Sequence, residues 1–219
     1  MRLRIVFCLV LVFGSVVSVC SKGEDEKLKK ELNAMESLDN RLEGLGEQFN
    51  CWFTIERRGN PTERTLASMR VNVGTQAKSR ESLVDALKSE LNDALIFVDA
   101  LHPQVVHIVD NSLEKVGTYS MVQKTTVKFE GVLADLPVKI GESIKGIDTR
   151  RGGSNTDAYN DHVTKVRIEA KAKSVREILT DAVPIEKYSR VLWVAETFQE
   201  GEQTKTWIQF TGPAESTTK

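Results

Sequence analysis

The sequence carries one order of helix and strand patterns twice, and this repetition limits the folds that the chain can adopt. In each half a serine introduces an amphipathic helix, and two short apolar strands joined by a turn follow it. Val71 and Val166, Ser79 and Ser174, Leu83 and Ile178, and Val84 and Leu179 each lie 95 residues apart, and Leu95 and Val191 lie 96 apart. The constant spacing predicts a duplication, with the one-residue drift placed in a turn, where insertions are tolerated.

The first half is predicted to open with a helix and a strand. One apolar stripe recurs at steps of three and four residues, through Leu28, Leu32, Met35, Leu38, Leu42 and Leu45. Such a stripe is typical of a helix with one buried face, and Gly44 and Gly46 are predicted to end it. Alternating apolar residues follow at Phe49, Cys51, Phe53 and Ile55. They predict a strand buried mainly on one face, which the turn residues 57–61 then break.

The second half is predicted to hold the same elements and one additional leading strand at residues 127–130. A helical stripe follows at Leu133, Leu136, Ile140, Ile144 and Ile147, with Pro137 tolerated only in its first turn. The predicted fold class is α+β, with two tandem duplicated modules, each a small mixed sheet with two packed helices. The modules are predicted to span residues 27–112 and 125–212, and residues 213–219 to form a flexible tail.

The N-terminus has the layout of a secretory signal peptide. Arg2 and Arg4 form a short basic region, an apolar run from Ile5 to Phe13 follows, and small residues lead to Cys20. The apolar stretch is shorter than the ~20 residues of a helix that spans a bilayer. Residues 1–20 are therefore predicted to be an export signal, and the mature chain is predicted to start between Val19 and Ser21.

The end of this segment leaves two outcomes open. Val17-Ser18-Val19-Cys20 resembles the bacterial lipoprotein box, in which the cysteine after the cleavage site receives lipid. Val19 departs from that box, because Gly, Ala or Ser normally precedes the cysteine. Lipidation at Cys20 predicts a periplasmic protein anchored to the membrane by lipid. Plain cleavage near Ser18 or Cys20 predicts a secreted or periplasmic protein without an anchor.

Composition limits the partners and the chemistry. The 30 Lys and Arg residues nearly balance the 31 Asp and Glu residues, so the chain has no bulk positive field for nucleic acid. After removal of residues 1–20, Cys51 is the only cysteine, and no internal disulfide framework is expected. Cys51 lies in an alternating strand and is predicted to be a buried small hydrophobe rather than a nucleophile.

One series of motifs resembles a known family. Phe129-Glu130-Gly131 and Leu133-Ala134-Asp135-Leu136 are followed by Val166-Arg167-Ile168-Glu169 and by Ser174-Val175-Arg176-Glu177-Ile178-Leu179. This series looks like the short N-terminal domain of bacterial secretins and TonB-dependent receptors. The resemblance covers most of residues 28–110 and 125–212 and rests on hydrophobic patterns. It implies tandem α+β docking domains in the periplasm and says nothing of catalysis. Pro137, Gly141 and the long loop at 148–162 depart from the family pattern.

No motif predicts a catalytic residue, a cofactor or a metal site. The three histidines, His102, His107 and His162, have no paired ligand spacing, so a zinc site is unsupported. His107 lies within an apolar strand and is predicted to be a sheet-face residue. The 148–162 loop, with Asp161 and His162, is the alternative place for a ligand.

Two pairs of arginines are the candidate partner contacts. Arg57-Arg58 and Arg150-Arg151 recur at the same place in the two halves. Guanidinium groups suit carboxylate or phosphate partners. The alternative interpretation is that all four are solvated loop charges.

Three functions remain open on the sequence. The favoured hypothesis is a non-catalytic interaction or assembly module that binds another cell-envelope protein through its sheet edges and its arginine turns. The second is an envelope enzyme or small-ligand-binding protein that uses the 148–162 loop. The third is a subunit of a homo-oligomeric envelope structure.

Overall fold

The computed structural model describes residues 36–59, 70–71, 74, 76–113, 116, 119–148 and 164–212. The chain divides into two compact units, Met1–Glu36 and Ser37–Lys219, and the fold below is that of the second unit. The predicted export signal with Cys20, the paired Arg150 and Arg151, most of the 148–162 loop and the tail at 213–219 lie outside the described residues.

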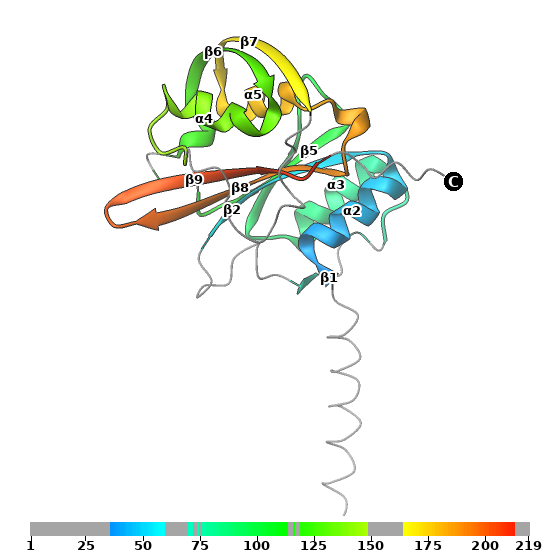
Figure 1. Cartoon of the computed structure of the whole chain (residues 1–219). Helices are drawn as coiled ribbons and strands as arrows, with labels where there is room; N and C mark the ends of the chain where they lie inside the picture. The colour runs from blue at the N-terminus through cyan, green and yellow to red at the C-terminus, as the bar shows by residue number, and fades with distance from the viewer. Residues whose placement is uncertain are drawn as a thin grey trace, which may run out of the picture. The chain divides into compact units, whose positions relative to one another are not determined.

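A five-stranded sheet forms the centre of this unit, in the order β4-β5-β2-β8-β9 (Figure 1). Its strands are β2 (Trp52–Arg58), β4 (Ala94–Val98), β5 (Val105–Asp110), β8 (Val191–Glu200) and β9 (Gln203–Phe210). Strand β2 is parallel to both of its neighbours, β5 and β8. Strands β4 and β9 are antiparallel to the strands beside them, so the two hairpins that the sequence predicts are confirmed.

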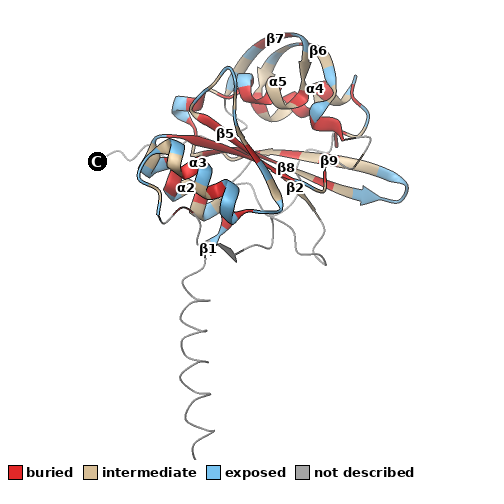
Figure 2. Ribbon diagram, turned by 180° about the vertical axis from the view of Figure 1, so that it is seen from behind, coloured by how far each residue is buried: buried red, intermediate tan, exposed pale blue. Residues whose placement is uncertain are grey.

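One layer covers each face of the sheet. Helices α2 (Leu38–Phe49) and α3 (Arg80–Glu90) cover one face. Helices α4 (Leu136–Gly141) and α5 (Val175–Ala182) lie on the other face with the antiparallel pair β6 (Lys124–Val132) and β7 (Lys165–Ser174) (Figures 1 and 2). The shorter elements are β1 (Glu36–Ser37), β3 (Arg70–Val71), η2 (Ser120–Val122), η3 (Leu133–Asp135) and η5 (Ile185–Lys187).

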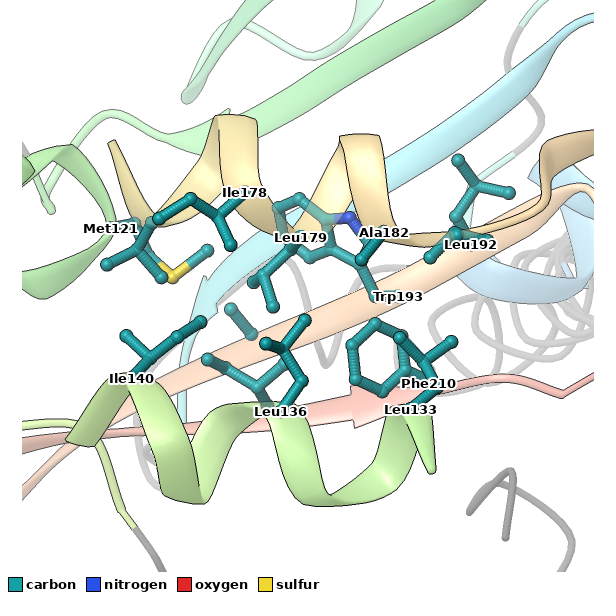
Figure 3. Packing of buried hydrophobic residues seen from close by; sticks show 14 of the residues in the cluster. Met121, Leu133, Leu136, Ile140, Ile178, Leu179, Ala182, Leu192, Trp193 and Phe210 are labelled. Carbon is teal, nitrogen blue, oxygen red and sulfur yellow. The ribbon is translucent and has the colours of Figure 1, made fainter. Parts of the chain in front are cut away.

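An apolar core lies on each side of the sheet, and alternate residues of β2 contribute to both. Phe53 and Ile55 pack with leucines of α2 and α3, whereas Trp52 belongs to the core under α4 and α5. Figure 3 shows this second core, in which side chains of α4 and α5 converge on residues of the sheet: Leu136, Ile140, Ile178, Leu179, Trp193 and Phe210. The sheet therefore holds the two helical layers together.

Ser79 and Ser174 begin α3 and α5, as the sequence predicts. Ser79 Oγ accepts a hydrogen bond from the backbone N–H of Ser82 at 3.2 Å, and Ser174 Oγ accepts one from Glu177 N–H at 3.3 Å. In each helix the third residue after the serine bonds back to the backbone N–H of that serine, which completes a capping box. Two donors at each helix start are satisfied in this way.

The predicted end of α2 at Gly44 and Gly46 is wrong. The helix continues to Phe49, and Asn50 ends it in the left-handed conformation at φ 50° and ψ 52°. Asn is one of the few residues besides Gly that adopt this conformation routinely. Gly46 instead permits close packing, because a Cβ at this position would lie 2.4 Å from Cβ of Arg190.

Strand β2 differs from its prediction in two ways. Thr54 and Glu56 are buried together with Phe53 and Ile55, so both faces of the strand are covered rather than mainly one. The strand also continues through Arg57 and Arg58, because β8 pairs alongside it through those residues. Burial on both faces is typical of a strand between parallel neighbours.

The predicted α+β class is confirmed, but the structure does not show two separate modules. Strands β8 and β9 from the second half join β4, β5 and β2 from the first half in one sheet. Each core also draws on both halves, with Val191 in the core under α2 and α3 and Val105 in the core under α4 and α5. The halves share a sheet because each side of β2 accepts one hairpin.

One shared sheet predicts that the two halves unfold together. Leu83 of α3 and Ile178 of α5 are fully buried in different cores, so replacing either by Ala is expected to cost about 2–5 kcal/mol of unfolding free energy. Hydrogen exchange is expected to accelerate in β2 and β8 for both variants, because these strands border both cores.

The control for this experiment is Val122→Ala, at a side chain that is 52% exposed. It is expected to change the unfolding free energy by less than about 0.5 kcal/mol. If each core variant lost protection in its own half alone, the two halves would be independent units and the prediction would be wrong.

Candidate functional site

Arg57, the first of the candidate partner contacts, is engaged within the domain. Its Nη2 lies 2.6 Å from Glu196 Oε1 on β8, and its Nη1 lies 3.1 Å from Asp39 Oδ2 in the first turn of α2. Burial alone lowers the pKa of Arg57, but the two carboxylates outweigh it and raise that pKa above its ordinary value. The side chain is only 15% exposed, so Arg57 ties β2 to α2 and β8 rather than standing in a solvated turn.

The other three candidate arginines lie at different places in the chain from the predicted turn or outside the described residues. Arg58 is the last residue of β2, so it lies at a strand end rather than in the predicted turn. Arg150 and Arg151 lie outside the described residues. The predicted patch of four equivalent guanidinium groups is therefore reduced by Arg57, whose charge is compensated by Asp39 and Glu196.

A buried polar cluster lies between β2 and α5, around Glu56. The Glu56 side chain has no exposed area and faces helix α5. Arg176 of α5 donates from Nε to Oε1 at 2.5 Å and from Nη2 to Oε2 at 2.8 Å, and the Tyr119 hydroxyl donates to Oε2. The bidentate geometry is the strongest form of this ion pair.

The partners of Glu56 respond to its charge. Burial and then the carboxylate of Glu56 raise the pKa of Tyr119 well above its ordinary value, so the phenol stays protonated as a donor. Burial lowers the pKa of Arg176, but the hydrogen bonds and charge of Glu56 exceed that effect and raise it. The phenol of Tyr119 therefore stays neutral and the guanidinium of Arg176 stays charged beside Glu56.

His107 of β5 forms a second polar group on the same face of the sheet. Its Nδ1 lies 2.6 Å from Thr54 Oγ1 on β2, and its Nε2 lies 2.9 Å from Asp99 Oδ2. Burial lowers the pKa of His107 below its ordinary value, against the opposing effect of Asp99. The neutral ring therefore donates from Nε2 to Asp99 and accepts the Thr54 hydroxyl at Nδ1. The prediction that His107 is a sheet-face residue is confirmed.

The series of hydroxyl, imidazole and carboxylate is the one that nucleophilic hydrolases use. Here Thr54 and His107 have no exposed area. A nucleophile must reach the atom that it attacks, so the buried Thr54 hydroxyl serves as an internal hydrogen-bond donor. The geometry supports a role in holding β2, β5 and the turn after β4 in register.

A surface extension continues this network at the turn between β4 and β5. Asp99 Oδ1 accepts from the backbone N–H of Leu101 and of His102, each at 2.8 Å. His102 Nε2 in turn lies 3.0 Å from Asp181 Oδ1 on α5, and Lys173 also pairs with Asp181. These bonds fasten the turn to α5 and leave Leu101 pointing into solvent, 62% exposed.

Cys51 is a buried thiol, as the sequence predicts. It belongs to the core under α2 and α3. Burial raises the pKa of Cys51 to about 11, against the lowering effect of the charges of Arg190 and Arg80. The group is therefore a neutral thiol near pH 7 and packs as a small hydrophobe.

The Glu56 network is the part of the site that sequence reasoning missed. Glu56 stands between Ile55 and Arg57 in a strand whose alternating pattern predicts burial mainly on one face, and that pattern does not mark Glu56 as buried. Trp52 lies on the same face of the strand as Glu56. A large aromatic residue on that face indicates that the face is covered rather than exposed to solvent.

Comparison with protein-family models, curated proteins and solved structures finds no match for this chain. Within the described residues, no three His, Cys, Asp or Glu side chains are grouped closely enough to hold a metal ion. The helices in that part of the chain include none long and apolar enough to cross a membrane.

The Glu56–Arg176 pair predicts a strongly coupled pair of substitutions. Arg176→Met leaves the Glu56 carboxylate buried without its cation and is expected to cost about 3–5 kcal/mol of unfolding free energy. Glu56→Gln in the same chain removes that buried charge and is expected to restore a large part of the loss. Denaturant unfolding of both single variants and the double variant measures the coupling. Costs that simply add would show that the two side chains stabilise the fold separately.

The pKa directions predict that acid destabilises this domain. Because the pKa of His107 is lowered, the unfolded chain binds its proton more readily, and unfolding free energy falls as pH drops below about 6.5. Burial raises the pKa of Asp99, but its bonds from His107, His102 and Leu101 outweigh this and lower it. Asp99 therefore contributes stability that is lost only at lower pH, below its ordinary value of about 3.9.

The measurement is unfolding free energy between pH 7 and pH 5. His107→Gln is expected to be less stable at pH 7 and to show a shallower pH dependence. Leu83→Ala, which lowers stability without touching the network, serves as the control and is expected to keep the wild-type slope. An unchanged slope in His107→Gln would assign the acid sensitivity to another group.

Proposed function

We propose that this chain is an exported cell-envelope protein that acts as a non-catalytic interaction or assembly module. The observation that carries the proposal is a contrast between the interior and one edge of the sheet. Charged groups of the interior have partners within the domain: Glu56 bonds Arg176, and Arg57 bonds Glu196. The edge strand β4 and the turn after it instead present Leu95, Val98 and Leu101 at the surface, with exposed fractions of 40%, 41% and 62%. Leu95 and Val98 lie on opposite faces of β4, so they border the same sheet edge from both sides, and exposed apolar side chains along one edge are typical of an interaction surface.

Export is proposed from residues 1–20. The basic pair Arg2 and Arg4, the apolar run and Cys20 support a signal peptide, with lipid attached to Cys20 or plain cleavage as the two outcomes. A periplasmic location fits the resemblance to the secretin N-terminal domain, which we retain as a proposal at the level of hydrophobic pattern.

The arginines that remain candidates for an acidic partner are Arg58, Arg150 and Arg151. Arginine forks favour bidentate contacts to carboxylates, and such contacts steer association. Arg57 serves a structural role in this proposal, because its guanidinium already bonds Asp39 and Glu196. A partner contact by Arg150 and Arg151 would add charge complementarity to the interaction.

We also propose that the two halves arose by duplication. The capping boxes at Ser79 and Ser174, 95 residues apart, and the hairpin that follows each helix support it. The sheet is not symmetric about this relation, because β2 is flanked by the second strand of one hairpin and the first strand of the other. An alignment of relatives tests the proposal, and failure of residues 70–110 to match residues 165–210 above chance would overturn it.

Export is tested by intact mass and cell fractionation. The mature chain is expected in the envelope or periplasmic fraction, starting between Val19 and Ser21, with a lipid mass added if Cys20 is modified. A cytosolic chain that retains residues 1–17 would remove the export part of the proposal. A cleaved chain without lipid would remove only the anchor.

The interaction role is tested by capture on immobilised mature protein from solubilised envelopes. One or more envelope proteins are expected to be retained. At low salt, the Arg150→Gln/Arg151→Gln variant is expected to retain less of them than the wild type does. Wild-type retention is expected to weaken as the Debye length falls from about 10 Å to 3 Å. If the protein retains nothing above a blank support at any salt concentration, the role of a binding module is wrong.

A further inference from the structure

The two edge strands of the sheet, β4 and β9, differ in how far they are protected from pairing with a further strand. At the β9 edge, residues 146–148 run alongside the strand: Thr206 N–H donates to Gly146 C=O at 2.6 Å, and Thr206 C=O accepts from Asp148 N–H at 2.8 Å. That strand also carries Lys205. A covering segment and a lysine are two usual ways in which proteins block pairing at a sheet edge.

The β4 edge has none of these protections among the described residues. Its sequence, Ala94-Leu95-Ile96-Phe97-Val98, contains no charge and no proline. Its pairing with β5 runs without a bulge, and the described residues include no strand on its outer side. A regular, uncharged and apolar edge strand is a template for a further strand.

The hydrogen-bond pattern with β5 shows which groups face outward. Asp99 N–H donates to Val105 C=O, and Asn111 N–H donates to Asp93 C=O. Hydrogen-bonded pairs alternate along an antiparallel ladder, so Leu95 and Phe97 also bond to β5, whereas the backbone groups of Ala94, Ile96 and Val98 point to the outer edge. Ala94 N–H is bonded to Leu91 C=O, which leaves chiefly Ile96 and Val98 to receive another strand.

We propose that the β4 edge pairs with the β4 edge of a second copy of this chain, antiparallel about a two-fold axis at Ile96. This inference rests on the proposed function as an assembly module and names its surface and its partner. In that register Leu95 lies beside Phe97 of the second copy, and Val98 lies beside Ala94. Both exposed side chains of the strand then gain an apolar neighbour, and no two like charges oppose within the strand.

Two properties favour a second copy over a different protein. The edge offers only apolar side chains, so it has no charged or polar group with which to select a foreign strand. Two-fold pairing also uses the unprotected β4 edge of each copy, and at the opposite edge residues 146–148 bond to β9 at Thr206. The sheets of two copies would therefore join into one and stop there, which gives a closed dimer rather than a fibre.

The residues at the ends of β4 limit the expected affinity of the dimer. Asp93 would lie opposite Asp99 of the second copy. The Asp99 carboxylate is already bonded by His107 and by the backbone N–H groups of Leu101 and His102, which reduces the repulsion but leaves it unfavourable. A short strand with this penalty predicts a dimer with micromolar rather than nanomolar affinity.

The experiment is sedimentation equilibrium of purified mature protein from about 1 to 200 µM, a range centred on micromolar affinity. The wild type is expected to pass from monomer to dimer. Val98→Lys places a charge on the edge and is expected to raise the dimer dissociation constant at least about tenfold. Val122→Lys adds the same charge at another exposed valine and is expected to dimerise like the wild type. Asp93→Asn is expected to tighten the dimer, because it removes the repulsion with Asp99.

Several outcomes would overturn this inference. They are a wild type that stays monomeric at every concentration, equal dimerisation of Val98→Lys and Val122→Lys, assemblies larger than a dimer, and no tightening by Asp93→Asn. A monomeric wild type that still captures an envelope protein, and loses it on Val98→Lys substitution, would overturn the second copy as occupant and leave the proposed function intact. Normal dimerisation with no captured protein would overturn the proposed binding of an envelope protein and leave the second copy as the occupant of the β4 edge.

Discussion

The ion pair between Glu56 and Arg176 is the interaction on which the arrangement of layers depends. A carboxylate without exposed area loses several kcal/mol of hydration, so it is tolerated only where a cation and further donors replace the water. Arg176 supplies two of those bonds and Tyr119 a third. Arg176 comes from α5 and Tyr119 from the segment before η2. Any other placement of α5 on the sheet would leave Glu56 buried and unpaired, so the pair fixes where that layer lies.

Strand β2 extends the same constraint to the opposite layer. Because successive side chains of a strand point to opposite faces, Glu56 and Arg57 face different helices. Glu56 bonds Arg176 of α5, and Arg57 bonds Asp39 of α2. Two consecutive charged residues at the end of one strand therefore hold both helical layers. A shift of register by one residue would exchange the two charges and place Arg57 against Arg176.

The sequence predicted the local elements well and their assembly poorly. Ser79 and Ser174 were found because a capping serine acts on the first turn of its own helix, and both hairpins were found because a short turn determines which strands pair. The shared sheet was not predicted, because the pairing of β2 with both β5 and β8 joins residues more than 50 and more than 130 positions apart. Alternation in β2 indicated one buried face, and only the packing of α4 and α5 explains why Trp52, Thr54 and Glu56 are also buried.

The two sheet edges follow from the same central strand. Once β2 has a hairpin on each side, one strand of each hairpin must lie at an edge, and the chain treats those edges unequally. The segment after α4 covers β9 at Thr206, and it can do so because α4 lies on that side of the sheet. The turn after β4 is instead fastened to α5 through His102 and Asp181, and Leu101 of that turn stays exposed. The bonds that stabilise the interior of the domain thus also keep the β4 edge extended, uncharged and in a fixed position, which is the form in which an edge accepts another strand at the lowest entropic cost.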